Sequence, residues 1–288
     1  MVLCNADARL FIPDGADPAI ALARTTDLCI TAHHDDIEIN AYAPIIECRS
    51  REDRWFTGVT VTDGAGSPRG GLYEWCTDEE MKRLRMEEQK QAAAIGRYSA
   101  QFMLSYSVPE VKASGNAALV NELERIILNC SPQSLFTHNL ADAHDTHVAT
   151  ALNVIRALKQ IPAGKRPGRV IALECWRSLD WLCDEDKVLL DTGASPNISA
   201  ALIGVHDSQV SGGKRYDLAA LGRRRANATF LCSHEVDKHD SLSIGLDITE
   251  LIEADQDPAE FIGRHIDKFK ADVTARIAKH RGVEPRRF

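Results

Sequence analysis

Strand-like apolar runs alternate with amphipathic helical segments along most of this chain, and this alternation limits the possible folds more than any other feature. Runs rich in apolar and β-branched residues predict strands at 27–32, 55–62, 101–106, 134–138, 169–175 and 187–191. Helical periodicity predicts helices at 78–95, 116–129, 146–158, 197–206 and 258–280. Such alternation is typical of a parallel sheet covered on both faces. We therefore expect an α/β fold, a Rossmann-like sandwich with a mostly parallel sheet and helices on both faces.

Length and composition favour one domain. The chain has 288 residues, of which 44% are hydrophobic, and this is enough for one large core. It contains no repeat or linker, so we expect a single domain over residues 1–288, in which 211–288 form a C-terminal region that ends in a helix. Within that region, the polar and Arg-rich stretch 212–227 resembles a loop near the mouth of a site. The helix at 258–280 is expected to pack on the core, and a contact in a homo-oligomer is the alternative.

Charge and cysteine usage exclude several classes of protein. A net charge of -8 and a pI near 5.7 argue against nucleic-acid binding, which needs a basic surface. No apolar stretch reaches the length of a membrane span, and the N-terminus lacks the basic and apolar segments of a secretory signal. The eight cysteines are scattered without a CxxC motif, which favours a reducing cytoplasm.

Two clusters of imidazoles and carboxylates, at 33–36 (HHDD) and 144–147 (HDTH), each follow a strand-like run. Sites in α/β folds lie at the carboxyl ends of the strands, where both clusters are expected. Histidine and aspartate are ligands of divalent ions. Residues three apart share one face at the start of a helix, so His33 can act with Asp36, or His144 with His147. Solvated loops are the alternative, but two clusters in equivalent positions favour one shared metal site.

The first cluster belongs to the sequence Ala32-His33-His34-Asp35-Asp36-Ile37-Glu38, and the second to Asp142-Ala143-His144-Asp145-Thr146-His147. These resemble the two motifs of the LmbE-like or PIG-L-type zinc-dependent de-N-acetylases, Ala-His-Pro-Asp-Asp followed by Glu, and Asp-x-His-Pro-Asp-His. Weaker similarities occur in the right order at 60–64, 85–88 and 206–209, so the resemblance covers about residues 27–210.

The resemblance implies one zinc ion per chain, bound by His33, Asp36 and His147. It also implies that Asp35 is the general base and that His144 steadies the tetrahedral intermediate or protonates the leaving amine. Two histidines and one carboxylate leave a coordination position open for water, although this ligand set also suits Fe(II) or another divalent ion. Because successive side chains diverge, Asp35 is free to accept a proton while Asp36 serves the metal.

The expected function is therefore that of a metal-dependent amide hydrolase, an N-deacetylase acting on N-acetylglucosamine or another N-acetylated amino sugar or conjugate. Arg85, Asp142 and Trp176 are predicted to contact this small-molecule substrate. The alternatives are a degenerate, non-catalytic protein that binds sugar or metal, and an amidase acting on a different amide conjugate.

Two residues depart from the family motifs. His34 stands where the family has a proline that stiffens the loop, and its imidazole competes with His33 as a possible ligand. Thr146 stands where the family has an aspartate that orients a neighbouring imidazole, a task that Asp142 could share. Among the other histidines, we expect His206 to form structural hydrogen bonds and His234 and His239 to lie in an exposed loop.

Overall fold

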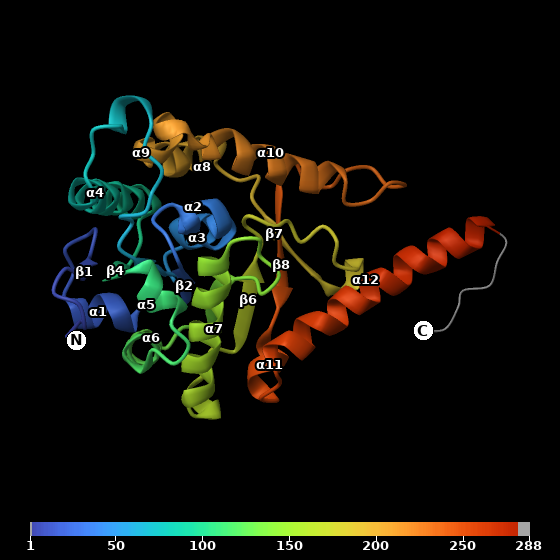
Figure 1. Ribbon diagram of the computed structural model, residues 1–288, viewed down its shortest axis with the longest axis horizontal. Coiled ribbons are helices and arrows are strands. Elements are labelled where there is room, and N and C mark those ends of the chain that lie inside the picture. Colours follow the sequence, from blue (N-terminus) through green and yellow to red (C-terminus); the bar gives the residue numbers. More distant parts are fainter. Residues whose placement is uncertain (1, 282–288) are drawn as a thin grey trace.

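A computed structural model describes residues 2–281, which are built around one eight-stranded sheet (Figure 1). The strands lie in the order β1-β4-β3-β2-β5-β6-β8-β7. Their bounds are β1 Arg9–Phe11, β2 Asp27–Thr31, β3 Phe56–Thr62, β4 Ala100–Tyr106, β5 Ser134–His138, β6 Arg169–Leu173, β7 Lys187–Asp191 and β8 Leu242–Asp247.

The five central strands, from β4 through β3, β2 and β5 to β6, are parallel. The edges are antiparallel, because β1 pairs with β4 and β8 pairs with both β6 and β7. The predicted α/β fold with a mostly parallel sheet is therefore confirmed. The short strand β1 and the strand β8 were not predicted.

Helices cover both faces of the sheet (Figure 1). The helices are α1 Pro18–Ala23, α2 Asp36–Asn40, α3 Tyr42–Arg49, α4 Asp78–Gly96, α5 Val108–Lys112, α6 Ala117–Cys130, α7 Asp145–Gln160, α8 Pro196–Gly204, α9 Asp207–Gln209, α10 Tyr216–Thr229, α11 Thr249–Glu253 and α12 Pro258–Arg281. One apolar cluster joins the sheet to α6 and α7 through residues such as Leu123 and Val154. A second cluster joins it to α3, α4 and α8 through residues such as Ile45 and Leu202.

The order of the strands places the two histidine clusters side by side. From β2 the chain builds β3 and β4 on one side, and it then crosses back to build β5 and β6 on the other. Because β2 and β5 are parallel neighbours, with Ile30 paired to Thr137, their carboxyl ends meet at the same edge of the sheet. This change of direction is the position at which open α/β sheets bind their ligands.

The prediction of a loop at 212–227 is wrong. The chain forms a π-helical turn, η4 (Val210–Lys214), followed by the helix α10. Its arginines suggested a loop near the mouth of a site, but Arg224 is only 2% exposed. The Arg224 guanidinium donates hydrogen bonds to the Oγ of Ser199 and to the backbone oxygens of Glu38 and Ile39. Burial of this cation ties α10 to α2 and α8, a contact that no local pattern reveals.

The helix expected at 258–280 is present as α12, but only its first turns pack on the core as predicted. Phe261 is buried, and His265 and Lys268 pair with Asp186. Beyond them the helix projects away from the body of the molecule (Figure 1). From residue 266 onward, four apolar side chains of α12 are between 38% and 53% exposed: Ile266, Phe269, Val273 and Ile277. Within residues 2–281, no helix is both long and apolar enough to cross a membrane.

Candidate active site

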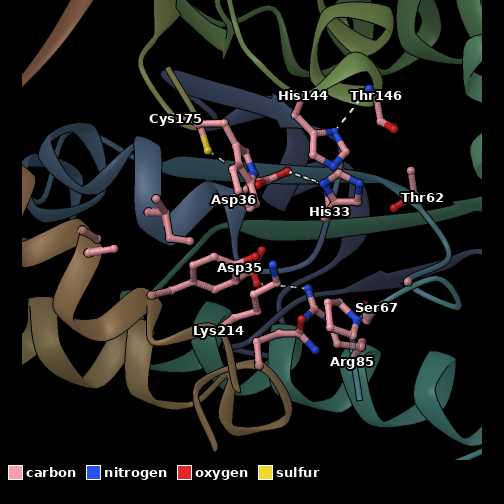
Figure 2. Close-up of a pocket in the computed structure, with 18 of the residues that line it drawn as sticks. His33, Asp35, Asp36, Thr62, Ser67, Arg85, His144, Thr146, Cys175 and Lys214 are labelled. Carbon is pink, nitrogen blue, oxygen red and sulfur yellow. Dashed lines mark hydrogen bonds and ion pairs between the residues drawn. The ribbon is translucent and has the colours of Figure 1, made fainter. Parts of the chain in front are cut away.

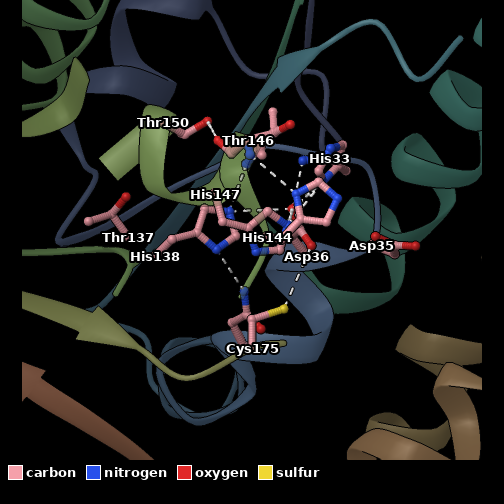
Figure 3. A network of polar contacts seen from close by, with 12 residues as sticks. His33, Asp35, Asp36, Thr137, His138, His144, Thr146, His147, Thr150 and Cys175 are labelled. Carbon is pink, nitrogen blue, oxygen red and sulfur yellow. Dashed lines mark hydrogen bonds and ion pairs between the residues drawn. The ribbon is translucent and has the colours of Figure 1, made fainter. Parts of the chain in front are cut away.

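Three side chains from the two predicted clusters meet at one point (Figure 3). The Nδ1 of His33 lies 3.1 Å from Asp36 Oδ2 and 3.1 Å from His147 Nε2, and the last two atoms are 3.3 Å apart. In a tetrahedral site with bonds of about 2.0–2.1 Å, ligand atoms are about 3.3–3.4 Å apart. The spacing and the donor types therefore fit a small divalent ion such as zinc.

Hydrogen bonds orient this triad. Asp36 is the first residue of α2, and its Oδ2 accepts a hydrogen bond of 2.7 Å from the backbone N–H of His33. His147 lies in the first turn of α7, where its Nδ1 faces Asp142 Oδ2 at 3.4 Å. A carboxylate behind a ligating histidine fixes the ring and its tautomer, leaving the other nitrogen for the metal.

The electrostatics of the triad show how strongly its side chains interact. Burial acts to raise the pKa of Asp36, but His147, His33 and His138 outweigh it and hold that pKa well below its ordinary value. Burial acts to lower the pKa of His147, but Asp36 and Asp142 raise it far above the ordinary value. A carboxylate and an imidazole that share one buried point favour each other's charged form. A metal ion bound here would take the place of the His147 proton, because histidine ligates as the neutral imidazole.

Asp35, the predicted base, lines the same cavity but points away from the triad toward Arg85 (Figure 2). Its φ of 93° is unusual for a residue other than glycine, and such strain is found mainly at functional sites. Burial raises the pKa of Asp35, and the Arg85 cation opposes that shift. The two adjacent carboxylates thus have separate partners, as the sequence predicts.

His144 caps the N-terminus of α7. Its Nδ1 accepts a hydrogen bond of 3.3 Å from the backbone N–H of Thr146, so the ring proton of the neutral imidazole lies on Nε2. Burial, followed by the neighbouring His147 and His33, lowers the pKa of His144 to about 4. The backbone of Thr146, and not a carboxylate, therefore holds this imidazole.

Two other predictions concern the surroundings of the triad. Asp142 is not among the residues that line the cavity, because its Oδ1 accepts from the His144 backbone N–H and its Oδ2 faces His147. The predicted substrate contact of Asp142 is therefore not supported. His34 is 1% exposed, and neither ring nitrogen finds a partner within the described residues. It lies toward Gly64 and away from the triad, which takes its imidazole from His33.

Two site residues were not foreseen in the sequence. His138 ends β5, and its ring stacks on His147 with 3.8 Å between centroids. Cys175 follows β6, with its Sγ 3.9 Å from Asp36 Oδ1. The available signal was that these two residues end the predicted strands 134–138 and 169–175.

His138 and Cys175 belong with Asp142 and His147 to a second group whose ligand atoms lie within 4.8 Å of one another. This group is a poorer metal site. The Nε2 of His138 already accepts a hydrogen bond of 2.9 Å from the backbone N–H of Ala32, and burial raises the pKa of Cys175 to about 12.

The triad opens into a cavity of about 730 Å³, part of which is drawn in Figure 2. Arg85 and Trp176, both predicted to contact substrate, line it, and so do Lys214 and Tyr216 from the segment predicted as a loop. His206 is buried with its Nε2 3.1 Å from Glu38 Oε2, which agrees with the expected structural role. His234 and His239 do not line the cavity.

Comparison with known proteins supports the predicted resemblance. Residues 28–158, which contain both motifs, match the family described as PIG-L: GlcNAc-PI de-N-acetylase. The resemblance to PIG-L-type deacetylases is therefore confirmed over that range. No curated protein matches the sequence.

Solved structures share the fold at low sequence identity. A conserved protein from Thermus thermophilus is 17% identical with a TM-score of 0.61, covering 77% of this chain and 94% of its own. The N,N'-diacetylchitobiose deacetylase from Pyrococcus horikoshii is 16% identical with a TM-score of 0.60, covering 76% and 83%. GalB, the 4-carboxy-2-hydroxymuconate hydratase from Pseudomonas putida, is 16% identical with a TM-score of 0.59, covering 78% and 96%.

Proposed function

We propose that this chain, whose residues 28–158 match the PIG-L family of deacetylases, is a metal-dependent hydrolase that removes an acetyl group from an N-acetylated amino sugar or its conjugate. The observation that carries the proposal is the meeting of His33, Asp36 and His147 at one point, beside a cavity that Asp35 and His144 also line.

His33, Asp36 and His147 would hold the metal, which we propose to be one zinc ion per chain, with Fe(II) or another divalent ion as the alternative. When bound at such a site, the ion lowers the pKa of a water ligand to about 7 and polarises a carbonyl group. Asp142 supports this role because it orients His147 from behind.

Asp35 acts as the general base. Its carboxylate is buried, so it is less well solvated than a surface carboxylate and accepts a proton more readily from the attacking water. Arg85 holds this carboxylate in place. Once protonated, Asp35 can return the proton to the leaving amine, which completes the cleavage of the amide.

His144 stabilises the oxyanion that forms as the amide carbonyl is attacked. Its Nδ1 is occupied by the backbone N–H of Thr146, which leaves an Nε2–H to donate. A preorganised donor of this kind costs no reorganisation during the reaction. This favours stabilisation of the intermediate over protonation of the amine, the two roles that the resemblance implies for His144.

The alternatives are a non-catalytic protein that binds sugar or metal, and an amidase for a different amide conjugate. Fold alone does not decide between reactions, because the similar structure GalB is named a hydratase. The zinc-loaded protein should release acetate from at least one member of a panel of N-acetylated sugars and conjugates. Chelation should abolish that release. If no member of the panel lost acetate, while zinc still bound, the non-catalytic alternative would be favoured.

Three expectations stay predictions: a single domain over residues 1–288, a cytoplasmic location and a homo-oligomer. For the homo-oligomer, the exposed apolar stripe of α12 would supply the contact. Light scattering during size-exclusion chromatography tests it, since Ile277→Glu should then shift the mass toward that of a monomer.

A further inference from the structure

Basic side chains outnumber acidic ones around the cavity, although the whole chain carries a net charge of -8. The basic residues that line it are Arg85, Lys112, Lys214, Arg223 and Arg224, and the acidic residues are Asp35, Asp36 and Glu174. A local excess of cations in an acidic protein concentrates anions at that place.

The three carboxylates are already engaged. Asp35 pairs with Arg85, and Asp36 belongs to the metal triad. The oxygens of Glu174 accept hydrogen bonds from the backbone N–H groups of Leu179 and Ile244 and from the Asn227 side chain. Among the residues that line the cavity, Lys112 and Lys214 therefore have no carboxylate partner.

Within residues 2–281, Lys214 is the one cation of this set without a hydrogen-bond or ion-pair acceptor, whereas even the buried Arg224 donates to Ser199 and to two backbone oxygens. Lys112 has Asp145 at 3.9 Å, and Arg223 donates to the backbone oxygen of Cys175 and also acts on Glu174. The Nζ of Lys214 lies 5.2 Å from the centre of the Trp176 ring. Figure 2 shows Lys214 reaching toward the cavity from the side opposite His144, with Asp35 between them in that view.

Trp176 connects Lys214 to the proposed reaction centre. Its ring centre lies 5.8 Å from that of His144 and 6.3 Å from that of Tyr216, and the residue is 45% exposed. An exposed aromatic face of this kind packs against the apolar face of a sugar ring or another flat group. A molecule that rests on Trp176 can therefore reach the triad at one end and Lys214 at the other.

We propose that the cavity contains an anion subsite in which Lys214, beside Trp176, binds a carboxylate or phosphate of the substrate while the acetylated nitrogen lies at the triad. The inference rests on the proposed function for the position of the acetyl group. The substrate class is accordingly an anionic N-acetylated compound, and Lys214 is the residue that selects it.

Binding of amine products tests the subsite without relying on turnover. Glucosamine and glucosamine 6-phosphate share their amine and differ in the phosphate at O6, and muramic acid carries instead a carboxylate on a lactyl group at O3. Titration calorimetry with the full-length zinc-loaded protein should show at least about tenfold tighter binding of one or both anionic compounds than of glucosamine, because a charge-assisted contact is strong. Comparison of the two anionic compounds shows whether a phosphate at O6 or a carboxylate at O3 is preferred.

Substitutions assign the preference to Lys214. In Lys214→Met, the dissociation constant of glucosamine should exceed that of the preferred anionic compound by less than about threefold. In Lys214→Glu, glucosamine should bind more tightly than either anionic compound. Lys238→Met is the matched control, because Lys238 is exposed, pairs with Glu235 and lies outside the cavity. It should keep the wild-type ratio.

The outcomes separate the two proposals. The anion subsite would be overturned if glucosamine and the anionic compounds bound equally well, or if none of them bound. It would also be overturned if Lys214→Met kept the wild-type ratio of dissociation constants. A third result would separate the two proposals: the wild-type protein prefers the anionic compounds and Lys214→Met loses that preference, but N-acetylglucosamine 6-phosphate and N-acetylmuramic acid both keep their acetyl group. In that case the subsite stands and the proposed deacetylation fails.

Discussion

Arg85 Nη2 lies 3.2 Å from Asp35 Oδ2, and the two side chains are only 2% and 7% exposed. Arg85 also donates to the backbone oxygen of His34, so it holds both the carboxylate and the loop that presents it. Its Nε and Nη1 find no partner among the described residues. A buried pair of this kind is costly to break, because the remaining charge is left uncompensated.

A double-mutant cycle measures this relationship. We expect Arg85→Met to lower the free energy of unfolding of the metal-free protein by about 3 kcal/mol or more, because it leaves the Asp35 carboxylate buried and unpaired. Asp35→Asn in the same background should restore part of the loss, giving a coupling energy of about 0.5–3 kcal/mol in urea denaturation. Strictly additive effects would show that the two side chains do not interact.

Asp35→Asn should separate the base from the metal ligands. The zinc content should stay that of the wild type, while kcat falls by roughly 10²–10⁴-fold, because the variant cannot accept a proton. Asp145→Asn is the control, since Asp145 is 90% exposed and should not alter either quantity. Normal turnover by Asp35→Asn, measured as acetate release, would rule out its role as the base.

Metal binding should depend on residues from both clusters. We expect about one zinc per chain by elemental analysis, and a marked loss of zinc in His147→Ala and in Asp36→Ala. His239→Ala should bind zinc like the wild type, because His239 does not line the cavity. Equal zinc in all four proteins would place the metal elsewhere.

Thr146→Val tests what holds His144. The valine keeps the backbone N–H that donates to His144 Nδ1 and replaces only the hydroxyl with a methyl group, so we expect kcat within about threefold of the wild type. A loss as large as that of His144→Ala would mean that the hydroxyl itself takes part in the reaction.

The attachment of α12 should depend on pH. Burial acts to raise the pKa of Asp186, but Lys268 and His265 outweigh it, so the folded pKa lies below the ordinary value of 3.8. The stabilisation is therefore present above the pKa of the unfolded chain and is lost as pH falls through the folded pKa. Asp186→Asn should lower Tm by a few degrees at pH 7. The difference from the wild type should shrink steadily below about pH 4, and a constant difference in calorimetric scans would contradict this account.

The sequence alone was enough to predict the parallel centre of the sheet and the joint position of the two clusters. The apolar runs at 27–32 and 134–138 are local patterns, and parallel neighbours necessarily end at the same edge. His33, Asp36 and His147 could therefore be named before their distances were known. The sequence predicted His138 only as the last residue of a strand. Its stacking on His147 joins two separate segments, and local patterns do not predict such contacts.

Tertiary structure decided the rest of the site. Arginine usually lies at the surface, yet Arg85 and Arg224 are each 2% exposed. The Asp35 carboxylate compensates the charge of Arg85, and backbone oxygens of α2 compensate that of Arg224. Lys214 lines the cavity because the segment predicted as a loop folds into η4 and α10, and α10 packs on β8. Local periodicity reports which side chains can be buried, whereas the partners that make burial of a charge possible are fixed by contacts between residues far apart in the chain.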